Sequence, residues 1–376
     1  MEGWFTPEDL NTSMMTSRQR MLTALDLGKP ERLPVSVHDW MQYYLDEYLG
    51  GISKAEAFEM FGLDWAIYAT PIKPVAPASE GWEKVVRVEG PDANGRMKEY
   101  TKIILHSKVL TQLVERDKYR SPWVIEYLCK EKDDIFDILR NSPKEIYDLD
   151  EERRVLDGIG DKGIMRGGRG GPWHRLCDLY GVERMIYAVF DDPKWVEDAL
   201  DAQTRADIDF LSTMRGTHMD LLETGGGHNS STVISPTLFE KFILPREARI
   251  HSFARNELGL RTVYHTCGGM MPILELLVEV GSTAIETLTP PSMGGDVNLA
   301  EVKRRVGDKV CLIGGFDQYN GFENATPNET SAMVRKCFAD AGEGGGYILN
   351  PSDHFFDCPV ENLRAYGEAA RGCIYD

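Results

Sequence analysis

The sequence predicts a single (β/α)8 barrel with a β-hairpin inserted between its second and third strands. From residue 160 onward, short apolar segments alternate with amphipathic helical stretches, a pattern typical of parallel strands separated by helices. Two further apolar segments lie upstream, which brings the strand candidates to the eight that close such a barrel. A chain of 376 residues is also within the length that α/β barrels with insertions reach as one folded unit.

The eight strands are expected at 33–39, 64–70, 162–167, 219–224, 260–266, 283–288, 310–316 and 346–350. Helices are expected between them. Ile273, Leu277 and Val280 recur at helical spacing before the stop signal Gly281, and Asn298 is a candidate N-cap for the segment LAEVKRRV.

The expected insertion lies between the second and third strands. VVRVEG and RMKEYTKIILH flank the turn PDANG, which indicates a hairpin at about residues 80–110. We expect the hairpin to be carried on the barrel, so that residues 1–376 form one domain.

Charge excludes several classes of partner. The net charge is −18 with no compensating block of lysine or arginine, so the electrostatic attraction that drives nucleic-acid binding is missing. No run approaches the ~20 apolar residues of a membrane helix, and the start MEGWFTPEDLNTS lacks the pattern of a signal peptide. We therefore expect a cytoplasmic protein that binds neither nucleic acid nor membranes, and a homodimer is one assembly that the sequence allows.

Polar side chains close most of the expected strands. In a (β/α)8 barrel the active site lies at the C-terminal ends of the strands, so these side chains are the candidates for chemistry. In chain order they are His38 and Asp39, Arg166, Glu223, His265 and Cys267, Glu286, Asp317 and Gln318, and Asp353 and His354.

The segment HTCGG, residues 265–269, contains the sharpest metal-binding signal. Residues i and i+2 of a strand point to the same side, so His265 and Cys267 can offer an imidazole and a thiolate to one cation. A catalytic zinc needs a third protein ligand from another strand end, for which the candidates are Asp353, His354, Cys358 and Glu223. A buried cysteine beside a hydrogen-bonded core histidine explains the same pattern about as often.

Four residues are candidate substrate contacts. Arg166 lies among glycines in MRGGRGGPWH and suits an anionic group, although pairing with a carboxylate of the protein explains it equally well. Trp40 and Phe355 are expected to wall an aromatic pocket, although aromatic residues at such spacing more often face a core. Glu286 is expected to complete the pocket from the sixth strand.

Three long segments resemble one known family. YHTCGGMMPILELLVEVGSTAIETL, LAEVKRRVGDKVCLIGGFD and GEGGGYILNPSDHFFDCPVENLRAYGEAA are similar to the uroporphyrinogen decarboxylase superfamily, which includes a branch of cobalamin-dependent methyltransferases. The segments ISPTLFEKFILPREARI and RQRMLTALDLGKPERLPV resemble it too, so the resemblance runs from about residue 18 to 370.

The resemblance favours the methyltransferase branch. True decarboxylases of the superfamily grip their substrate through an arginine-rich motif after the first strand, whereas the corresponding VSVHDWMQYYLDEYL has no arginine. The methyltransferases bind zinc through an H-x-C and a cysteine after the last strand. His265 and Cys267 match the first part, but Asp353 or His354 stands where the second cysteine is expected. A site with one sulfur ligand is a stronger Lewis acid, which suits an oxygen- or nitrogen-linked methyl donor.

The sequence therefore predicts a zinc-dependent methyltransferase that works with a separate corrinoid-carrying protein. His38, Asp39 or Glu223 would manage the proton of the leaving group. Three alternatives stay open: a decarboxylase of the uroporphyrinogen type, a non-catalytic corrinoid- or tetrapyrrole-binding protein, and a solvated barrel mouth with no chemistry.

Overall fold

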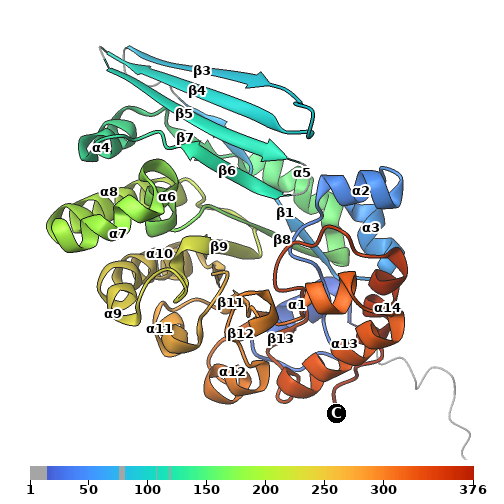
Figure 1. Ribbon diagram of the computed structural model, residues 1–376. Coiled ribbons are helices and arrows are strands. Elements are labelled where there is room, and N and C mark those ends of the chain that lie inside the picture. Colours follow the sequence, from blue (N-terminus) through green and yellow to red (C-terminus); the bar gives the residue numbers. More distant parts are fainter. Residues whose placement is uncertain (1–14, 76–80, 107, 118–119) are drawn as a thin grey trace, which may run out of the picture.

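A curled parallel sheet forms the centre of the computed structural model, which describes residues 15–75, 81–106, 108–117 and 120–376 (Figure 1). Its seven strands lie in chain order, each paired in parallel with the next. They are β1 (Trp65–Tyr68), β8 (Gly163–Gly168), β9 (Leu221–Gly225), β10 (Arg261–His265), β11 (Ala284–Thr287), β12 (Cys311–Gly314) and β13 (Tyr347–Ile348). Each overlaps the expected segment, with ends at most two residues from those expected, and together they give the predicted α/β-barrel class.

The first expected strand, 33–39, is the exception, because it forms only an isolated parallel bridge between Val35 and Leu349. The segment nevertheless lies between the two outer strands of the sheet. The Asp64 amide donates to the Val35 carbonyl over 2.7 Å on one side, and the Ser36 amide donates to the Leu349 carbonyl over 3.0 Å on the other. These bonds close the ring next to β1 and β13, as an eighth strand would.

Helices surround the sheet, as the alternating pattern predicts (Figure 1). They are α1 (Ser17–Leu25), α2 (Gln42–Leu49), α3 (Lys54–Phe61), α4 (Lys132–Asn141), α5 (Leu149–Ile159), α6 (Pro172–Tyr180), α7 (Val182–Asp191), α8 (Pro193–Ser212), α9 (Pro236–Leu238), α10 (Leu244–Leu258), α11 (Leu274–Glu279), α12 (Leu299–Val306), α13 (Pro327–Ala341) and α14 (Val360–Arg371). The side chain of Asn298 caps α12 by accepting from the Glu301 amide, and Leu277 of α11 is fully buried.

The insertion is larger than the expected hairpin. β3 (Trp82–Glu89) and β4 (Met97–Leu105) pair antiparallel around the PDANG turn, but β5 (Lys108–Asp117) and β6 (Arg120–Glu126) extend them to a four-stranded sheet. A separate pair of short strands, β2 (Ile72–Pro74) and β7 (Glu145–Tyr147), joins the two ends of the insertion. The hairpin expectation stopped at about residue 110 because the segment after it is polar and its alternation is weak.

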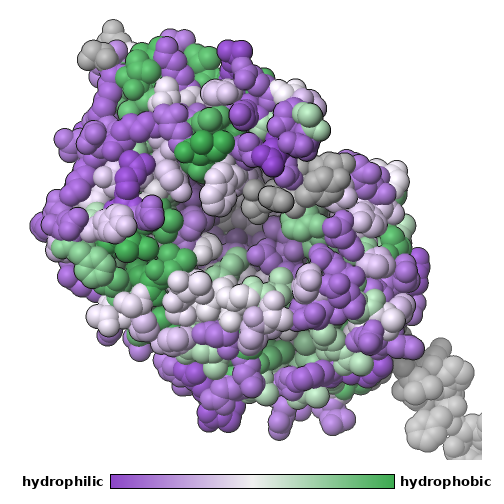
Figure 2. Space-filling model, viewed as in Figure 1, coloured by the Kyte–Doolittle hydropathy of each residue, from purple (hydrophilic) through white to green (hydrophobic). Residues whose placement is uncertain are grey.

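Small and branched side chains fill the barrel interior. Ala66, Ile164, Leu221, Val263 and Ile313 form one buried cluster with Met21, Ala24 and Leu25 of α1. Since α1 precedes the first strand segment, it covers the N-terminal end of the barrel, and the polar strand ends lie at the opposite end. Figure 2 shows the face in view hollowed between the four-stranded sheet and the barrel. Within the described ranges, no helix is both long and apolar enough to cross a membrane.

A buried carboxyl group lies behind β9 on α10. Glu247 and His251, one helical turn apart, are both fully buried. The two nitrogens of His251 bond the hydroxyls of Thr224 and Thr262 over 2.8 and 2.7 Å. Burial raises the pKa of Glu247 to about 8 and lowers the pKa of His251 to about 3, so both are neutral in the folded protein near pH 7.

We expect the buried Glu247 to make stability fall as the pH rises. Its pKa is about 8 in the folded protein and 4.5 in model compounds, so the folded state holds the proton more tightly. Glu247 therefore leaves the free energy of unfolding unchanged below about pH 4.5. Between that value and pH 8 it lowers the free energy of unfolding by up to about 1.4 kcal/mol per pH unit. Glu247→Gln should match the wild type at pH 5 and be more stable by roughly 2–4 kcal/mol at pH 8.

Urea unfolding at a series of pH values measures this difference. The exposed Glu240→Gln is the matched control and should show no such trend. A difference between Glu247→Gln and wild type that stays constant from pH 5 to pH 8 would contradict the assignment.

Candidate active site at the C-terminal strand ends

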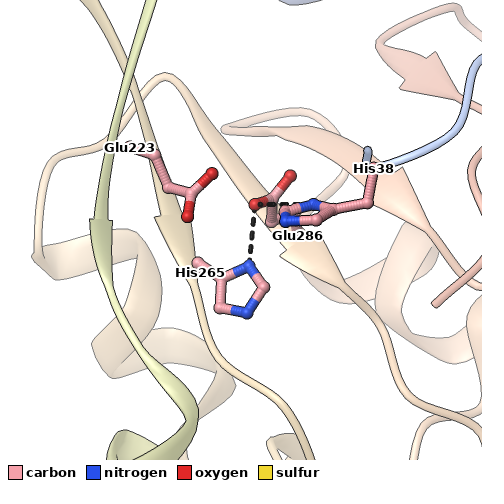
Figure 3. Close-up of side chains that lie close together, drawn as sticks. All are labelled: His38, Glu223, His265 and Glu286. Carbon is pink, nitrogen blue, oxygen red and sulfur yellow. Dashed lines mark hydrogen bonds and ion pairs between the residues drawn. The ribbon is translucent and has the colours of Figure 1, made fainter. Parts of the chain in front are cut away.

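Four ionisable side chains converge at the C-terminal ends of the barrel strands. One ligand atom from each of His38, Glu223, His265 and Glu286 lies within 4.8 Å of the others (Figure 3). Strand register explains the convergence. His265 pairs directly with Glu286 across β10 and β11, and Glu223 pairs with Val263, two residues before His265. Since alternate residues of a strand share a face, all three side chains point inward.

Arg166 of β8 lies against this cluster and bridges its two carboxylates. It is 2% exposed, and its Nη2 donates to Glu286 Oε1 over 2.7 Å and also to Glu223 Oε2. Burial favours neutral side chains, but the two carboxylates outweigh it and raise the pKa of Arg166 above its usual value. The guanidinium is therefore a permanent positive charge inside the barrel mouth.

The two bridged carboxyl groups have different proton affinities. Burial would raise the pKa of Glu286, but Arg166 and then His38 bring it well below the usual value. Burial, followed by the charge of Glu286, raises the pKa of Glu223 above the usual value. Glu286 therefore stays ionised, and Glu223 is the group that takes up a proton more readily. Such a pair can divide anchoring and proton transfer between its members.

His265 connects the carboxylates to Cys267. Its Nδ1 lies 2.8 Å from Glu286 Oε1, and its Nε2 lies 3.1 Å from Cys267 Sγ. Burial raises the pKa of Cys267, the imidazole of His265 opposes that rise, and Asp353 adds to it. The thiol therefore needs a nearby cation to ionise. A carboxylate that fixes Nδ1 while Nε2 faces a sulfur is the arrangement that orients a metal-binding histidine.

His38 and the segment after β13 complete the site. His38 Nδ1 lies 3.7 Å from Glu286 Oε1, and its ring lies 5.1 Å from the rings of both His265 and His354. Burial lowers the pKa of His38 well below its usual value, so its imidazole is neutral. A narrow, closely packed recess adjoins His38 and Glu286 and is also lined by Thr287, Ile313, Asn350, Pro351 and Ser352.

Cys358, an alternative third metal ligand, lies away from this cluster. It is fully buried in the main hydrophobic core, and its carbonyl accepts a 2.7 Å hydrogen bond from the Tyr44 hydroxyl. Asp353 instead contacts Cys267 closely enough to affect its pKa, and His354 contacts His38. The structure thus brings Asp353 and His354 to the candidate site and leaves Cys358 in the core.

Two expected aromatic contacts are core residues instead. Trp40 and Phe355 are 2% and 3% exposed and pack edge to face with their rings 5.9 Å apart. Trp40 also packs against Phe58 and Phe61 of α3. The expectation of an aromatic pocket wall fails here because the chain turns outward after His38 and buries these rings between the barrel and its helices.

Two other expected residues are held by partners within the protein. Asp39 forms an ion pair with Lys54 over 2.6 Å and does not join the cluster, so its predicted proton-handling role has no support in this geometry. Arg166 was expected to receive an anionic substrate group, but Glu223 and Glu286 already occupy it. The internal ion pair, the alternative left open from the sequence, describes its placement.

One residue of the site was missed from the sequence. Tyr68 ends β1, with its ring 5.8 Å from Arg166 Cζ and 6.3 Å from the His38 ring. Burial and the charge of Glu223 raise the pKa of its hydroxyl, so it is a neutral donor. Its position at the end of an expected strand was a signal that could have identified it.

The chain belongs to the uroporphyrinogen decarboxylase family. The family model described as "Uroporphyrinogen decarboxylase (URO-D)" matches residues 99–373, which is most of the chain. The resemblance drawn from the sequence motifs is thereby confirmed. Family membership defines the class of fold and site but leaves the reaction open, because curated relatives of the chain carry two kinds of name.

Two of these relatives are methyltransferases and others are decarboxylases. The chain is 24% identical over 195 residues to the methylated-thiol–coenzyme M methyltransferase of Methanosarcina mazei, a match that covers 51% of this chain and 49% of the relative. It is 27% identical over 218 residues to the methylcobamide:CoM methyltransferase MtaA of Methanosarcina barkeri, covering 58% and 60%. A uroporphyrinogen decarboxylase of Neisseria meningitidis is 26% identical over 214 residues, covering 53% and 54%. The matches thus span about half the length of these relatives.

A solved structure confirms the fold over nearly the whole chain. A methyltransferase from Methanosarcina mazei superimposes with a TM-score of 0.64, covering 95% of this chain and 98% of that one at 18% sequence identity. At this identity the likeness establishes the architecture alone.

We expect the Arg166 bridge to be a large contributor to folding stability. Arg166→Met leaves two buried carboxyl groups without their cation, which should cost about 3–5 kcal/mol of unfolding free energy. Urea unfolding at pH 7 measures this loss. The control Arg154→Met removes an exposed ion pair with Glu151 and should cost less than about 1 kcal/mol. Equal small losses in both variants would show that the bridge is not buried as described.

Proposed function

We propose that the protein is a zinc-dependent methyltransferase of the cytoplasm. It moves a methyl group between a small O- or N-methylated substrate, aromatic or not, and the cobalt of a partner corrinoid protein. The observation that carries this proposal is the contact between His265 and Cys267 at the mouth of a barrel whose family includes methyltransferases. The names of two curated relatives support a methyl group and a cobamide as the species exchanged.

The side chains around Cys267 suit a zinc ion. His265 and Cys267 supply nitrogen and sulfur ligands, and Asp353 or His354 supplies the third. Two buried polar atoms next to this set, Glu286 Oε2 and His354 Nδ1, have no hydrogen-bond partner among the described residues. Such orphaned atoms in a group of metal-binding side chains are consistent with a cation position. When bound, zinc would supply Lewis-acid polarisation of the heteroatom that bears the methyl group.

The ligand set favours an oxygen- or nitrogen-linked methyl donor. With Cys358 in the core, one sulfur remains near His265. A site dominated by nitrogen and oxygen ligands is harder than one with two thiolates, so it matches a hard donor atom better than a thiol.

The chain's own residues would manage the proton and the charge. As the methyl–heteroatom bond breaks, the methyl group passes to cobalt(I) of the partner and the bonding pair stays on the heteroatom, which then needs a proton. Glu223 is placed to donate it, because its pKa is raised by burial and by Glu286. Glu286 would hold His265 in one orientation, and Arg166 would keep Glu286 ionised.

Decarboxylation of a polycarboxylate has less support from this site. A substrate with many carboxylates needs free cationic side chains, and residues 35–49 contain no arginine. The one arginine of the described cluster, Arg166, is already bonded to two carboxylates. Because some relatives are named decarboxylases, decarboxylation is the alternative activity that an assay must test.

Metal analysis and a methyl-transfer assay test the proposal together. We expect zinc in the purified protein and its loss from the strand-end site in Cys267→Ala. We also expect zinc-dependent loss of the Co(I) absorption when a reduced corrinoid protein and the right methyl donor are added. His218→Ala, an exposed histidine on the loop before β9, is the control and should retain both properties. Release of carbon dioxide from uroporphyrinogen with no partner present would overturn the proposal.

Replacing Glu223 tests its role as proton donor. Glu223→Gln keeps the shape and a hydrogen bond to Arg166 but cannot donate an acidic proton. We expect the methyl-transfer rate to fall by about 10²–10⁴-fold with methyl donors whose demethylated fragment is a poor leaving group. The loss should shrink with donors whose leaving group needs no proton. A uniform small effect on all donors would assign Glu223 a structural role only.

A further inference from the structure

Three further metal-ligand side chains meet near the same end of the barrel, outside the cluster around Arg166. They are His174 and Asp178 of α6 and His228 of the short turn Gly227–Asn229, and we call them the rim triad. α6 follows β8 and the turn follows β9, so both segments leave the barrel at its C-terminal end. None of the three side chains takes part in the reaction proposed above.

The spacing of the rim triad is that of metal ligands. His174 Nε2 lies 3.4 Å from Asp178 Oδ2, and His228 Nε2 lies 3.6 Å from Asp178 Oδ1. These distances exceed the roughly 2.7–3.2 Å of a nitrogen–oxygen hydrogen bond. Two ligands of a tetrahedral ion with bonds of about 2.0–2.2 Å are separated by about 3.3–3.6 Å, which is the spacing of each histidine from the oxygen that it faces, the two imidazoles facing different oxygens of the carboxylate. One ligand atom of each residue lies within 4.8 Å of the others.

The ring of His174 is partly buried between two glycines, and one of its nitrogens has no partner in the described ranges. A Cβ atom on Gly170 or Gly226 would come within 2.5 Å and 2.3 Å of ring atoms of His174, so only glycine fits beside the imidazole. Its Nδ1 is buried and, among the described residues, has no hydrogen-bond partner. The Nε2 atom, which faces Asp178, is the ligand atom that the ring presents to the other two members.

The backbone at His228 is tied to α6, and Asp178 has no competing cation among the described residues. Trp173 of α6 donates its Nε1 hydrogen to the His228 carbonyl over 3.1 Å, which ties the turn to the helix. In the described part of the chain, Asp178 forms ion pairs with the two imidazoles and with no lysine or arginine. Asp178 is about half exposed, so an ion can enter from solvent.

We propose that the rim triad binds one divalent first-row transition-metal ion, zinc or iron(II), through two imidazoles and one carboxylate. Two histidines and a carboxylate that leave coordination positions open form a ligand set used by both metals. The site is separate from the one at His265 and Cys267, so the protein would hold two ions per chain. The second site contains no sulfur.

Metal counting in variants separates the two sites. The protein is stripped with a chelator, dialysed against Zn²⁺ or, without oxygen, against Fe²⁺, and analysed for bound metal. In the double variant His265→Ala and Cys267→Ala, we expect one metal ion per chain to remain bound, at the rim triad. Asp178→Asn or His228→Ala in that background should weaken its binding by at least about tenfold. His218→Ala is the matched control, and circular dichroism verifies that each variant is folded.

The outcomes distinguish this inference from the proposed function. If the reaction centre holds no metal but the rim triad does, wild type binds one ion, which His228→Ala removes and Cys267→Ala does not. If Asp178→Asn and His228→Ala both fold and retain the stoichiometry and affinity of their parent, the rim triad is not a metal site. Cobalt(II) gives a second readout, because a thiolate charge-transfer band should be absent from the ion held by the rim triad.

Discussion

The buried bridge from Arg166 to Glu223 and Glu286 is the interaction on which the candidate site depends. Three strands place these side chains on the inner face of the barrel mouth, where two carboxylates without a cation would destabilise the fold. The guanidinium offsets both charges and is itself kept ionised by them. The two carboxyl groups are unequal, because Arg166 and then His38 bring the pKa of Glu286 below its usual value, whereas burial and the charge of Glu286 raise the pKa of Glu223.

That inequality reaches the proposed metal ligands through His265. Ionised Glu286 accepts from Nδ1 of His265, which leaves Nε2 directed at Cys267. One network thus links Glu223, the proposed proton donor, to an anchored imidazole and a thiol across neighbouring strand ends. Parallel register accounts for the arrangement, because residues that end adjacent strands on the same face must lie side by side. The same architecture accommodates both reactions named among the relatives, so the side chains at the mouth decide between them.

Much of this arrangement could be predicted from the sequence, and the failures have physical causes. Apolar runs locate the strands of the sheet, and the polar residue after each run locates Glu223, His265 and Glu286. The prediction that Trp40 and Phe355 line a pocket was wrong, because the sequence near the end of a strand does not indicate which way the chain turns next. The sequence left open whether Arg166 binds substrate or an internal carboxylate, because its partners come from strands far along the chain. The rim triad was missed for the same reason, although the i, i+4 spacing of His174 and Asp178 was visible.

The proposed reaction requires a metal ion bound between His265 and Cys267, and anomalous diffraction at the zinc absorption edge tests for that ion most directly. Crystals of the protein grown with zinc should show an anomalous peak about 2.3 Å from Cys267 Sγ and about 2.0–2.1 Å from a nitrogen of His265. Asp353 or His354 should provide the third protein ligand. Well-ordered density for these side chains with no anomalous peak within about 5 Å of Cys267 Sγ would contradict the account.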